Sequence, residues 1–307
     1  MISFSAPAKI ILSGEHSVVY GKPAFAAGID KRLRVSIFGR KGFLPSQWSI
    51  VEKVVLEYLS DNKIKFTKKS FSVRIESDIP KGRGLGSSAA FAVASTGAYI
   101  KFLSGRSFDK QTINNLAYKI EKEFHGRPSG IDNSTSCFGG LIFFRKEFEF
   151  LKVISRLNFK IPDSISNRLY LIDTGKPKES TKDMVEFVGR RFNKNPLKTR
   201  IILSEIERST KQMVVSVVKE DQRLFAESVK KNHLLLDKLG VVSDWLKRRL
   251  SFLEKYGAYK ITGAGSRKGP AGFVLFIDLS GEGDSILKKT GFKYFRISFD
   301  NRGLVEL

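Results

Sequence analysis

The sequence predicts an α+β fold in two domains, and three observations support this prediction. The chain has 307 residues, which exceeds the length of one typical domain. Its first half mixes strand-like alternation with helical segments, whereas its second half has a long helical stretch followed by strands. A polar stretch at 162–167 separates the halves. We therefore predict domains at residues 1–165 and 166–307, each of the α+β type rather than one doubly wound sheet.

In the first half, period-two alternation marks the strands and a 3.6-residue period marks the helices. These patterns predict, in order, strand 3–13, strand 23–38, helix 46–60, strand 71–77, helix 87–104, helix 109–124 and strand 139–144. A tight turn region at 15–22 joins the first two strands. In the helix at 109–124, Ile113, Leu116 and Ile120 recur on one side, which is typical of a helix that packs on a core.

The second half begins with a strand at 168–173 and is rich in helix between 181 and 256. Ser243 with Asp244 is a good helix N-cap, and Gly257 is a good stop signal. The half closes with three predicted strands, at 259–262, 272–278 and 294–298.

The composition limits where the protein can work. The single cysteine, Cys137, excludes an internal disulfide and suits a reducing compartment. Residues 1–9 lack the basic and apolar regions of a signal peptide, and no apolar run reaches the ~18 residues that span a bilayer. We therefore expect a cytoplasmic protein without a membrane partner.

The net charge is strongly positive. Lys and Arg number 54 against 31 Asp and Glu, which gives +23 at pH 7. Such a charge favours nucleic acid through counterion release. However, the basic residues are dispersed in short clusters such as 247–249 and 288–289, and no basic motif with interleaved aromatic residues occurs. A solvated basic surface explains the charge better, so we do not expect a nucleic-acid partner.

The segment 78–90, Asp-Ile-Pro-Lys-Gly-Arg-Gly-Leu-Gly-Ser-Ser-Ala-Ala, is the most informative part of the chain. It follows a predicted strand and leads into a predicted helix. Glycines let the backbone approach an anion, and the free N–H groups and dipole at the helix start face its charge. The spacing fits neither a Walker A loop nor a dinucleotide fingerprint. The residues alone therefore predict a phosphate site of unassigned type.

Residues 121–134 contain three carboxylates, Glu121, Glu123 and Asp132, around a turn rich in glycine and proline. If this turn faces the phosphate site, one carboxylate could hold Mg²⁺ while another takes a substrate proton, as phosphoryl transfer requires. Taken alone, the segment favours solvated helix charges and a turn residue. The periodicity does not choose between the two glutamates, since they flank the apolar stripe on opposite sides.

The N-terminal segment places Lys9 inside a predicted strand and Gly14-Glu-His16 at the turn that follows. This combination is unusual for a structural segment, although a lysine at a strand edge can extend its ammonium group to solvent. A lone histidine such as His16 is more often structural than a ligand.

Taken in order, three segments resemble the three signature motifs of the GHMP kinase superfamily: 7–16, 80–90 and 262–265. A closer resemblance, to the mevalonate kinases and especially their short archaeal and bacterial forms, is carried by 14–23, 125–133 and 232–243. The resemblance covers nearly the whole chain. It implies an N-terminal domain of the ribosomal-S5-like type and a ferredoxin-like C-terminal domain, with the active site between them.

The resemblance also implies a reaction. Mevalonate kinases transfer a phosphate from ATP to the C5 hydroxyl of mevalonate, in the mevalonate pathway of isoprenoid biosynthesis. We therefore expect ATP and Mg²⁺ as cofactors and mevalonate as the small-molecule partner. Enzymes of this family are often dimeric, so a homodimer is compatible with the resemblance.

Carried over residue by residue, the resemblance assigns roles to single positions. Asp132 matches the general base that accepts the hydroxyl proton, and Lys9 matches the catalytic lysine beside it. The expected nucleotide contacts are Lys9, Ser77, Gly82, Gly84, Leu85, Gly86, Ser87 and Ser88. The expected magnesium ligands are Ser88 and Glu121. The expected substrate contacts are Asp132, His16 and Arg145, the last with Lys146 beside it.

The chain departs from the family pattern after Thr262-Gly-Ala-Gly, where further glycines usually follow. Here the loop continues Ser266-Arg-Lys-Gly-Pro. We expect its two basic residues either to add charge at the phosphate site or to alter nucleotide affinity.

Two other functions compete with this one. The first is a GHMP kinase for another small alcohol, such as phosphomevalonate or a sugar. Galactokinases typically continue Gly-Glu-His with Thr-Asp, whereas Ser-Val follows here, and homoserine kinases lack the Asp at position 132. The second is a nucleic-acid-binding protein with an S5-like domain, which would leave Asp132 and Glu121 without a role.

Overall fold

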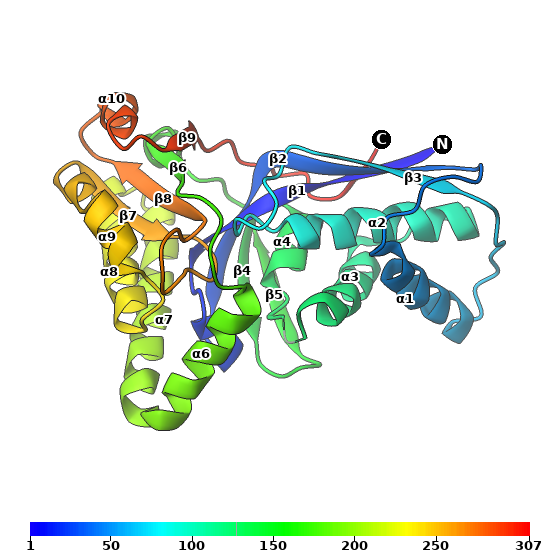
Figure 1. The fold of residues 1–307 in the computed structure, drawn as a ribbon, viewed down its shortest axis with the longest axis horizontal. Coiled ribbons are helices and arrows are strands. Elements are labelled where there is room, and N and C mark those ends of the chain that lie inside the picture. Colours follow the sequence, from blue (N-terminus) through cyan, green and yellow to red (C-terminus); the bar gives the residue numbers. More distant parts are fainter. Residues whose placement is uncertain (127) are drawn as a thin grey trace.

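A computed structural model of the protein describes residues 1–126 and 128–307. The strands form a six-stranded and a four-stranded sheet, both antiparallel, and helices pack on each (Figure 1). The first sheet is built from the first half of the chain and the second sheet from the second half, apart from the last strand. This architecture confirms the predicted α+β class.

The first sheet has the strand order β10-β1-β2-β4-β5, and β3 also pairs with β2. Its strands are β1 (Ile2–Ser13), β2 (Ala24–Phe38), β3 (Ser72–Ser77), β4 (Leu141–Lys146), β5 (Lys152–Leu157) and β10 (Val305–Glu306). The long apolar strands β1 and β2 pair over most of their length. Their register shifts between Pro7 and Ala8, directly before Lys9. Such irregularities often re-aim a side chain next to an active site.

Helices pack on one side of this sheet (Figure 1). They are α1 (Trp48–Asp61), α2 (Ser87–Ser104), α3 (Lys110–His125) and α4 (Ile131–Phe138), and the short η1 (Ser17–Tyr20) follows β1. α2 is buried along most of its length, which its small alanine side chains permit. At Gly97 the packing is so close that a Cβ would lie 2.9 Å from Cδ1 of Phe4. The first half of the chain therefore has a tightly packed core between β1 and α2.

The second sheet has the strand order β7-β8-β6-β9. Its strands are β6 (Leu169–Asp173), β7 (Gly257–Ile261), β8 (Phe273–Asp278) and β9 (Lys293–Arg296). The helices of this half are α5 (Asp163–Ser166), α6 (Thr181–Lys194), α7 (Pro196–Val218), α8 (Gln222–Lys238), α9 (Asp244–Leu250) and α10 (Gly283–Lys288), with η2 (Ser251–Lys255). The predicted N-cap Ser243 accepts a hydrogen bond from Leu246 N at the start of α9.

The sequence patterns miss several short elements, among them α4, β5, α5, α10 and β10. α4 lies where the sequence predicts a turn, and Gly130 and Gly139 bracket it. Its residues 133–136 are polar but buried, so the helix has no apolar stripe to reveal it. Asp132 therefore belongs to the first turn of a helix, which corrects the prediction that it lies in a loop.

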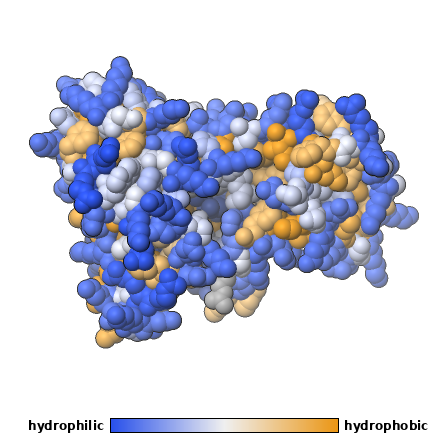
Figure 2. All heavy atoms as spheres, in the orientation of Figure 1, coloured by the Kyte–Doolittle hydropathy of each residue, from blue (hydrophilic) through white to orange (hydrophobic). Residues whose placement is uncertain are grey.

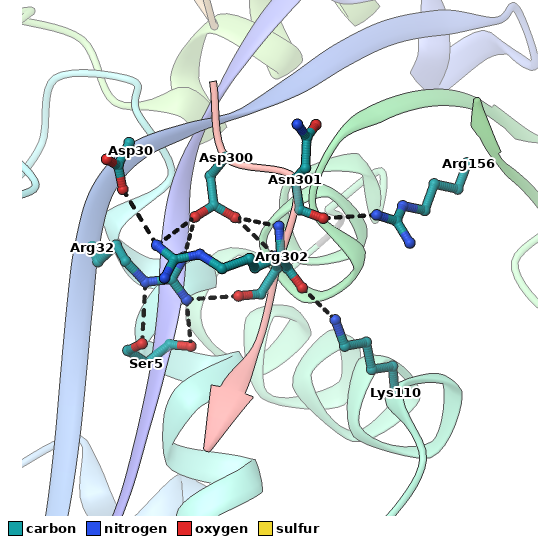
Figure 3. Close-up of polar contacts among 9 residues, drawn as sticks. Ser5, Asp30, Arg32, Lys110, Arg156, Asp300, Asn301 and Arg302 are labelled. Atoms are coloured by element: carbon teal, nitrogen blue, oxygen red, sulfur yellow. Dashed lines mark hydrogen bonds and ion pairs between the residues drawn. The ribbon is translucent and has the colours of Figure 1, made fainter. Parts of the chain in front are cut away.

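The C-terminal segment returns from the second sheet to the first. Asp300 N donates to Gly28 O at 2.9 Å, and Gly140 N donates to Asp300 O at 2.7 Å. The Asp300 carboxylate, which is 3% exposed, pairs with Arg32 and Arg302 (Figure 3). β10 then pairs with β1. The last residues thus belong to the first sheet.

The two halves share apolar contacts. Leu171 and Leu275 of the second sheet belong to the same buried cluster as Phe4 and Ile10 of the first. The predicted division between residues 165 and 166 falls within α5, and it remains a prediction.

One face of the molecule is mainly hydrophilic. Figure 2 shows hydrophilic residues over most of one face, while hydrophobic residues gather over α2 and its neighbours. Within residues 1–126 and 128–307, no helix combines the length and the apolar character that a membrane crossing needs.

Candidate active site

The glycine-rich turn lies between β3 and α2, as the sequence predicts. Gly82, Gly84 and Gly86 have φ angles of 69°, 87° and 76°, which other residues rarely adopt. Gly86 is the N-cap of α2, so the turn ends at the N-terminus of a long buried helix. The unpaired N–H groups and the dipole at such a terminus favour an anion. The turn can therefore present backbone N–H groups to a phosphate.

Lys9 packs directly against this turn. Its backbone N donates to Leu85 O at 3.0 Å, and the residue is only 2% exposed. A Cβ on Gly86 would lie 2.9 Å from Lys9 Cγ, so glycine leaves the space that the lysine side chain fills. The turn thus holds the lysine in place as well as offering its backbone to an anion.

Lys9 Nζ lies 3.0 Å from Asp132 Oδ1. Asp132 is in the first turn of α4, where the helix N-terminus favours its negative charge. Its side chain is 38% exposed, whereas that of Lys9 is almost fully buried. A carboxylate that is fixed on one side by an ammonium group and open on the other can accept a proton from a bound hydroxyl.

Ser88, Glu121 and His125 form a second polar group. Ser88 Oγ lies 3.4 Å from Glu121 Oε2 and 3.1 Å from His125 Nε2. Glu121 is 3% exposed, and its Oε1 has no hydrogen-bond partner in the described part of the chain. Burial, with a further contribution from the Asp132 charge, raises the pKa of Glu121 to about 8. Without a cation the Glu121 carboxyl is therefore mainly protonated at pH 7, and a cation bound beside it and the Ser88 hydroxyl would favour its charged form.

These groups fit a magnesium ion that is bound together with phosphate. No cluster of three or more His, Cys, Asp or Glu ligands occurs among residues 1–126 and 128–307. Mg²⁺ usually keeps several waters and is held by one or two carboxylates plus substrate phosphates, so a dedicated protein cage is not required. Glu121 and Ser88 suit that arrangement. Glu123, in contrast, is exposed, and its Oε1 lies 3.8 Å from Lys53 Nζ.

His16 and the third motif meet between the two sheets. His16 has a φ of 60°, which is rare for a non-glycine residue, and its Nε2 lies 2.9 Å from Ala264 O. Burial lowers the pKa of His16, so the ring is neutral at pH 7. Thr262 Oγ1 accepts a hydrogen bond from Ile11 N at 2.9 Å. The third motif thus connects the second half of the chain to β1, close to Lys9.

Sequence reasoning missed a buried ion pair in the same region. Glu15 and Lys260 pair with each other, and their side chains are 1% and 0% exposed. Lys260 also donates to Ile11 O at 3.2 Å and to Ile261 O at 2.7 Å. The available signal was a lysine within an apolar strand, because buried lysines are rare unless they are paired.

Two predicted contacts, Arg145 and Ser77, do not touch Lys9 or Asp132 among the described residues. Arg145 is exposed, and its Nε lies 2.7 Å from Glu147 Oε1. Ser77 ends β3, and its hydroxyl accepts a hydrogen bond from a backbone N–H two residues later. Among the described residues, neither Arg145 nor Ser77 therefore has a contact with the Lys9–Asp132 pair.

The unusual loop after the third motif is attached to α6 and the segment before it. Arg267 Cζ lies 4.3 Å from the centroid of the Phe187 ring. Ser266 Oγ donates to Glu179 Oε2 at 2.7 Å. The charge of Arg267 is thus directed to an aromatic ring of α6 rather than to the glycine turn.

Comparisons with known proteins identify relatives of the whole chain. Two family models match the chain: GHMP kinases N terminal domain at residues 49–140, and GHMP kinases C terminal at residues 213–287. The mevalonate kinase of Pyrococcus abyssi is 34% identical over 301 residues, which is 86% of each chain. The mevalonate kinase of Methanothermobacter thermautotrophicus is 29% identical over 317 residues, which is 99% of each chain.

Solved structures have the same fold. The mevalonate kinase of L. major, in complex with R-mevalonate, has a TM-score of 0.75 at 22% identity and covers 97% of this chain and 95% of that chain. The mevalonate kinase of Methanococcus jannaschii has a TM-score of 0.77 at 23% identity, with 97% and 98% covered. Because the identity to curated relatives exceeds 30% over most of the chain, the chain belongs to the mevalonate kinase family of GHMP kinases.

Proposed function

We propose that this enzyme transfers the γ-phosphate of ATP to the C5 hydroxyl of mevalonate, giving 5-phosphomevalonate and ADP in the mevalonate pathway. Membership of the mevalonate kinase family supports this proposal. The observation that carries it is the contact of 3.0 Å between the buried Lys9 ammonium and the Asp132 carboxylate, next to the glycine turn. Phosphoryl transfer to an alcohol needs a base, a nearby cation and a phosphate cradle, and this pair and turn supply them.

Asp132 is the general base in this proposal. The C5 oxygen attacks the γ-phosphorus while its proton passes to the exposed side of the Asp132 carboxylate, and the bond between the γ-phosphorus and the bridging oxygen of ADP breaks. Lys9 orients the carboxylate and places a positive charge where negative charge develops on the transferring group. The first N–H groups of α2 face the same phosphates from the turn.

Ser88 and Glu121 are the proposed Mg²⁺ ligands, and the ion would neutralise phosphate oxygens of the nucleotide. Glu121 Oε1 has no hydrogen-bond partner among the described residues, which supports this assignment because a buried polar oxygen without a partner is costly. His125 contacts Ser88 and orients its hydroxyl.

His16 and Arg145 are the proposed mevalonate contacts. A carbonyl can only accept, so the His16 Nε2 that faces Ala264 O carries the hydrogen. This leaves Nδ1 of the neutral ring as an acceptor for a substrate hydroxyl. The exposed Arg145 guanidinium is proposed to pair with the mevalonate carboxylate, and Ser77 to contact the nucleotide.

We further propose that the enzyme works in the cytoplasm. Cys137 is a buried free thiol, and burial raises its pKa to about 12, so it is neither a disulfide partner nor a reactive thiolate. A homodimer is the assembly compatible with the family, and sedimentation velocity would measure it.

A coupled assay of ADP release tests the proposed function. Four alcohols would be compared at equal concentration: mevalonate, phosphomevalonate, galactose and homoserine. We expect turnover with ATP and mevalonate, and none above background with the other three. Absence of mevalonate-dependent ADP release would refute the proposal, and faster turnover with phosphomevalonate or a sugar would move the enzyme to another branch of the superfamily.

A further inference from the structure

The loop between β6 and α6, residues 174–179, has a rigid base. Thr174 N and Oγ1 both donate to Gly272 O, at 3.0 and 2.6 Å, and Gly272 N donates to Gly175 O at 3.1 Å. Gly175 N donates to Asp173 Oδ1 at 3.0 Å. At the other end, the side chain of Ser180 caps α6. Both ends of the loop are therefore fixed.

This base is attached to the glycine-rich turn of the other half of the chain. The Asp173 carboxylate, which anchors the loop, also pairs with the guanidinium of Arg83 in the turn. Phe273 N donates to Arg83 O at 3.3 Å. The loop and the turn therefore keep a fixed relation across the boundary between the two sheets.

Lys176 extends from this loop onto the turn. A Cβ on Gly82 would lie 3.3 Å from Lys176 Cε and 3.8 Å from its Cδ, so the end of the lysine side chain rests on the glycine. Lys176 is exposed, and no carboxylate or hydrogen-bond acceptor pairs with its ammonium group among residues 1–126 and 128–307. Lys9 packs against Gly86 at the opposite end of the same turn. The side chains of Lys176 and Lys9 thus lie against the two ends of the turn.

We propose that Lys176 binds the polyphosphate of the nucleotide, so that both halves of the chain hold the same anion. This inference rests on the proposed function and adds a contact from the second half to it. A charged group held at the edge of a phosphate cradle forms charge-assisted hydrogen bonds with phosphate oxygens. The fixed base of the loop reduces the ordering cost of that contact. Since no acidic residue in the described part of the chain pairs with it, the ammonium group is free to make this contact.

Calorimetric titration of ADP with Mg²⁺ into the full-length chain tests this inference. We expect Lys176→Met to weaken ADP binding by about tenfold, as loss of one charge-assisted contact does. Lys176→Arg keeps the charge and should restore binding to within about threefold of the wild type. In the kinetic assay, the KM for ATP should rise in Lys176→Met while the KM for mevalonate stays the same. The difference between wild type and Lys176→Met should shrink as KCl is raised.

Lys289→Met is the matched control, because Lys289 is also exposed but follows α10 on the second sheet. ADP binding by Lys176→Met at wild-type strength, or an equal loss in Lys289→Met, would overturn the inference. If the wild type binds ADP and phosphorylates mevalonate while Lys176→Met is unaffected, only the role of Lys176 is refuted. A wild-type protein that does neither refutes the proposed function and this inference together.

Discussion

Lys9 Nζ lies 3.0 Å from Asp132 Oδ1, and the two side chains differ sharply in exposure, at 2% and 38%. The ammonium group is therefore closed off by the protein, while the carboxylate remains open to a ligand. A substrate hydroxyl can approach Asp132 without displacing Lys9. In the proposed mechanism this asymmetry separates two roles: Asp132 contacts the reacting group, and Lys9 orients Asp132 and balances its charge.

Replacement of Asp132 by Asn should remove the base while keeping the shape of the site. We expect kcat to fall by about 10³-fold, within the range typical of general-base catalysis. ADP binding should stay near the wild-type value, because the turn at 82–88 is untouched. The ADP-release assay and calorimetry measure the two quantities. A kcat close to that of the wild type would exclude Asp132 as the base.

Lys9→Met should lower kcat by about 10²-fold, because the carboxylate loses its fixed cationic partner. Lys9→Arg should not restore the rate. The Lys9 side chain packs so closely on Gly86 that a Cβ there would lie 2.9 Å from Lys9 Cγ. The wider guanidinium group of arginine therefore has no room at this position. Circular dichroism would confirm that both variants fold. Recovery of the rate in Lys9→Arg would show that charge alone, without this packing, is sufficient.

Glu121 and Glu123 provide a matched pair on the same helix. Glu121→Gln removes a buried carboxylate, so we expect the Mg²⁺ concentration for half-maximal rate to rise by about tenfold or more. Glu123→Gln removes only an exposed charge that lies 3.8 Å from Lys53, and it should leave that concentration unchanged. Rates measured across a Mg²⁺ series decide between the two. Equal shifts in both variants would contradict the assignment of Glu121 to the metal.

The sequence predicted those parts of the fold whose residues show a regular apolar pattern or turn-forming glycines. The glycine turn and the helix after it are where the pattern places them, since positive φ and small side chains are local requirements. α4 was not predicted because its buried residues 133–136 are polar and form no apolar stripe; Asn133 and Ser134 bond to Asn114 of α3 instead.

The candidate site likewise contains residues that the sequence could assign and a contact that it could not. Lys9, Ser88, Glu121 and Asp132 were assigned through a family resemblance, and the structure brings them together. The contact of Lys176 with the turn could not be predicted from sequence, because it depends on how the two halves pack.

Stability should fall on mild acidification, and His233 is one cause. The residue is 5% exposed on α8, and its ring centroid lies 4.6 Å from that of Tyr259. Burial lowers the pKa of His233 to about 4. In the unfolded chain the ring has its ordinary pKa near 6.5, so between these values the unfolded state binds more protons than the folded state. The free energy of unfolding therefore decreases as the pH falls from about 6.5 towards about 4.

Between pH 7 and pH 5, this difference should remove about 2 kcal/mol from the free energy of unfolding. His233→Phe keeps an aromatic ring against Tyr259 but cannot be protonated, so its stability should depend less on pH over the same range. Part of the slope should remain, because burial also lowers the pKa values of His16 and His125. Urea denaturation at pH 7, 6 and 5 measures both proteins. Identical pH slopes for wild type and variant would show that His233 is not buried in its neutral form.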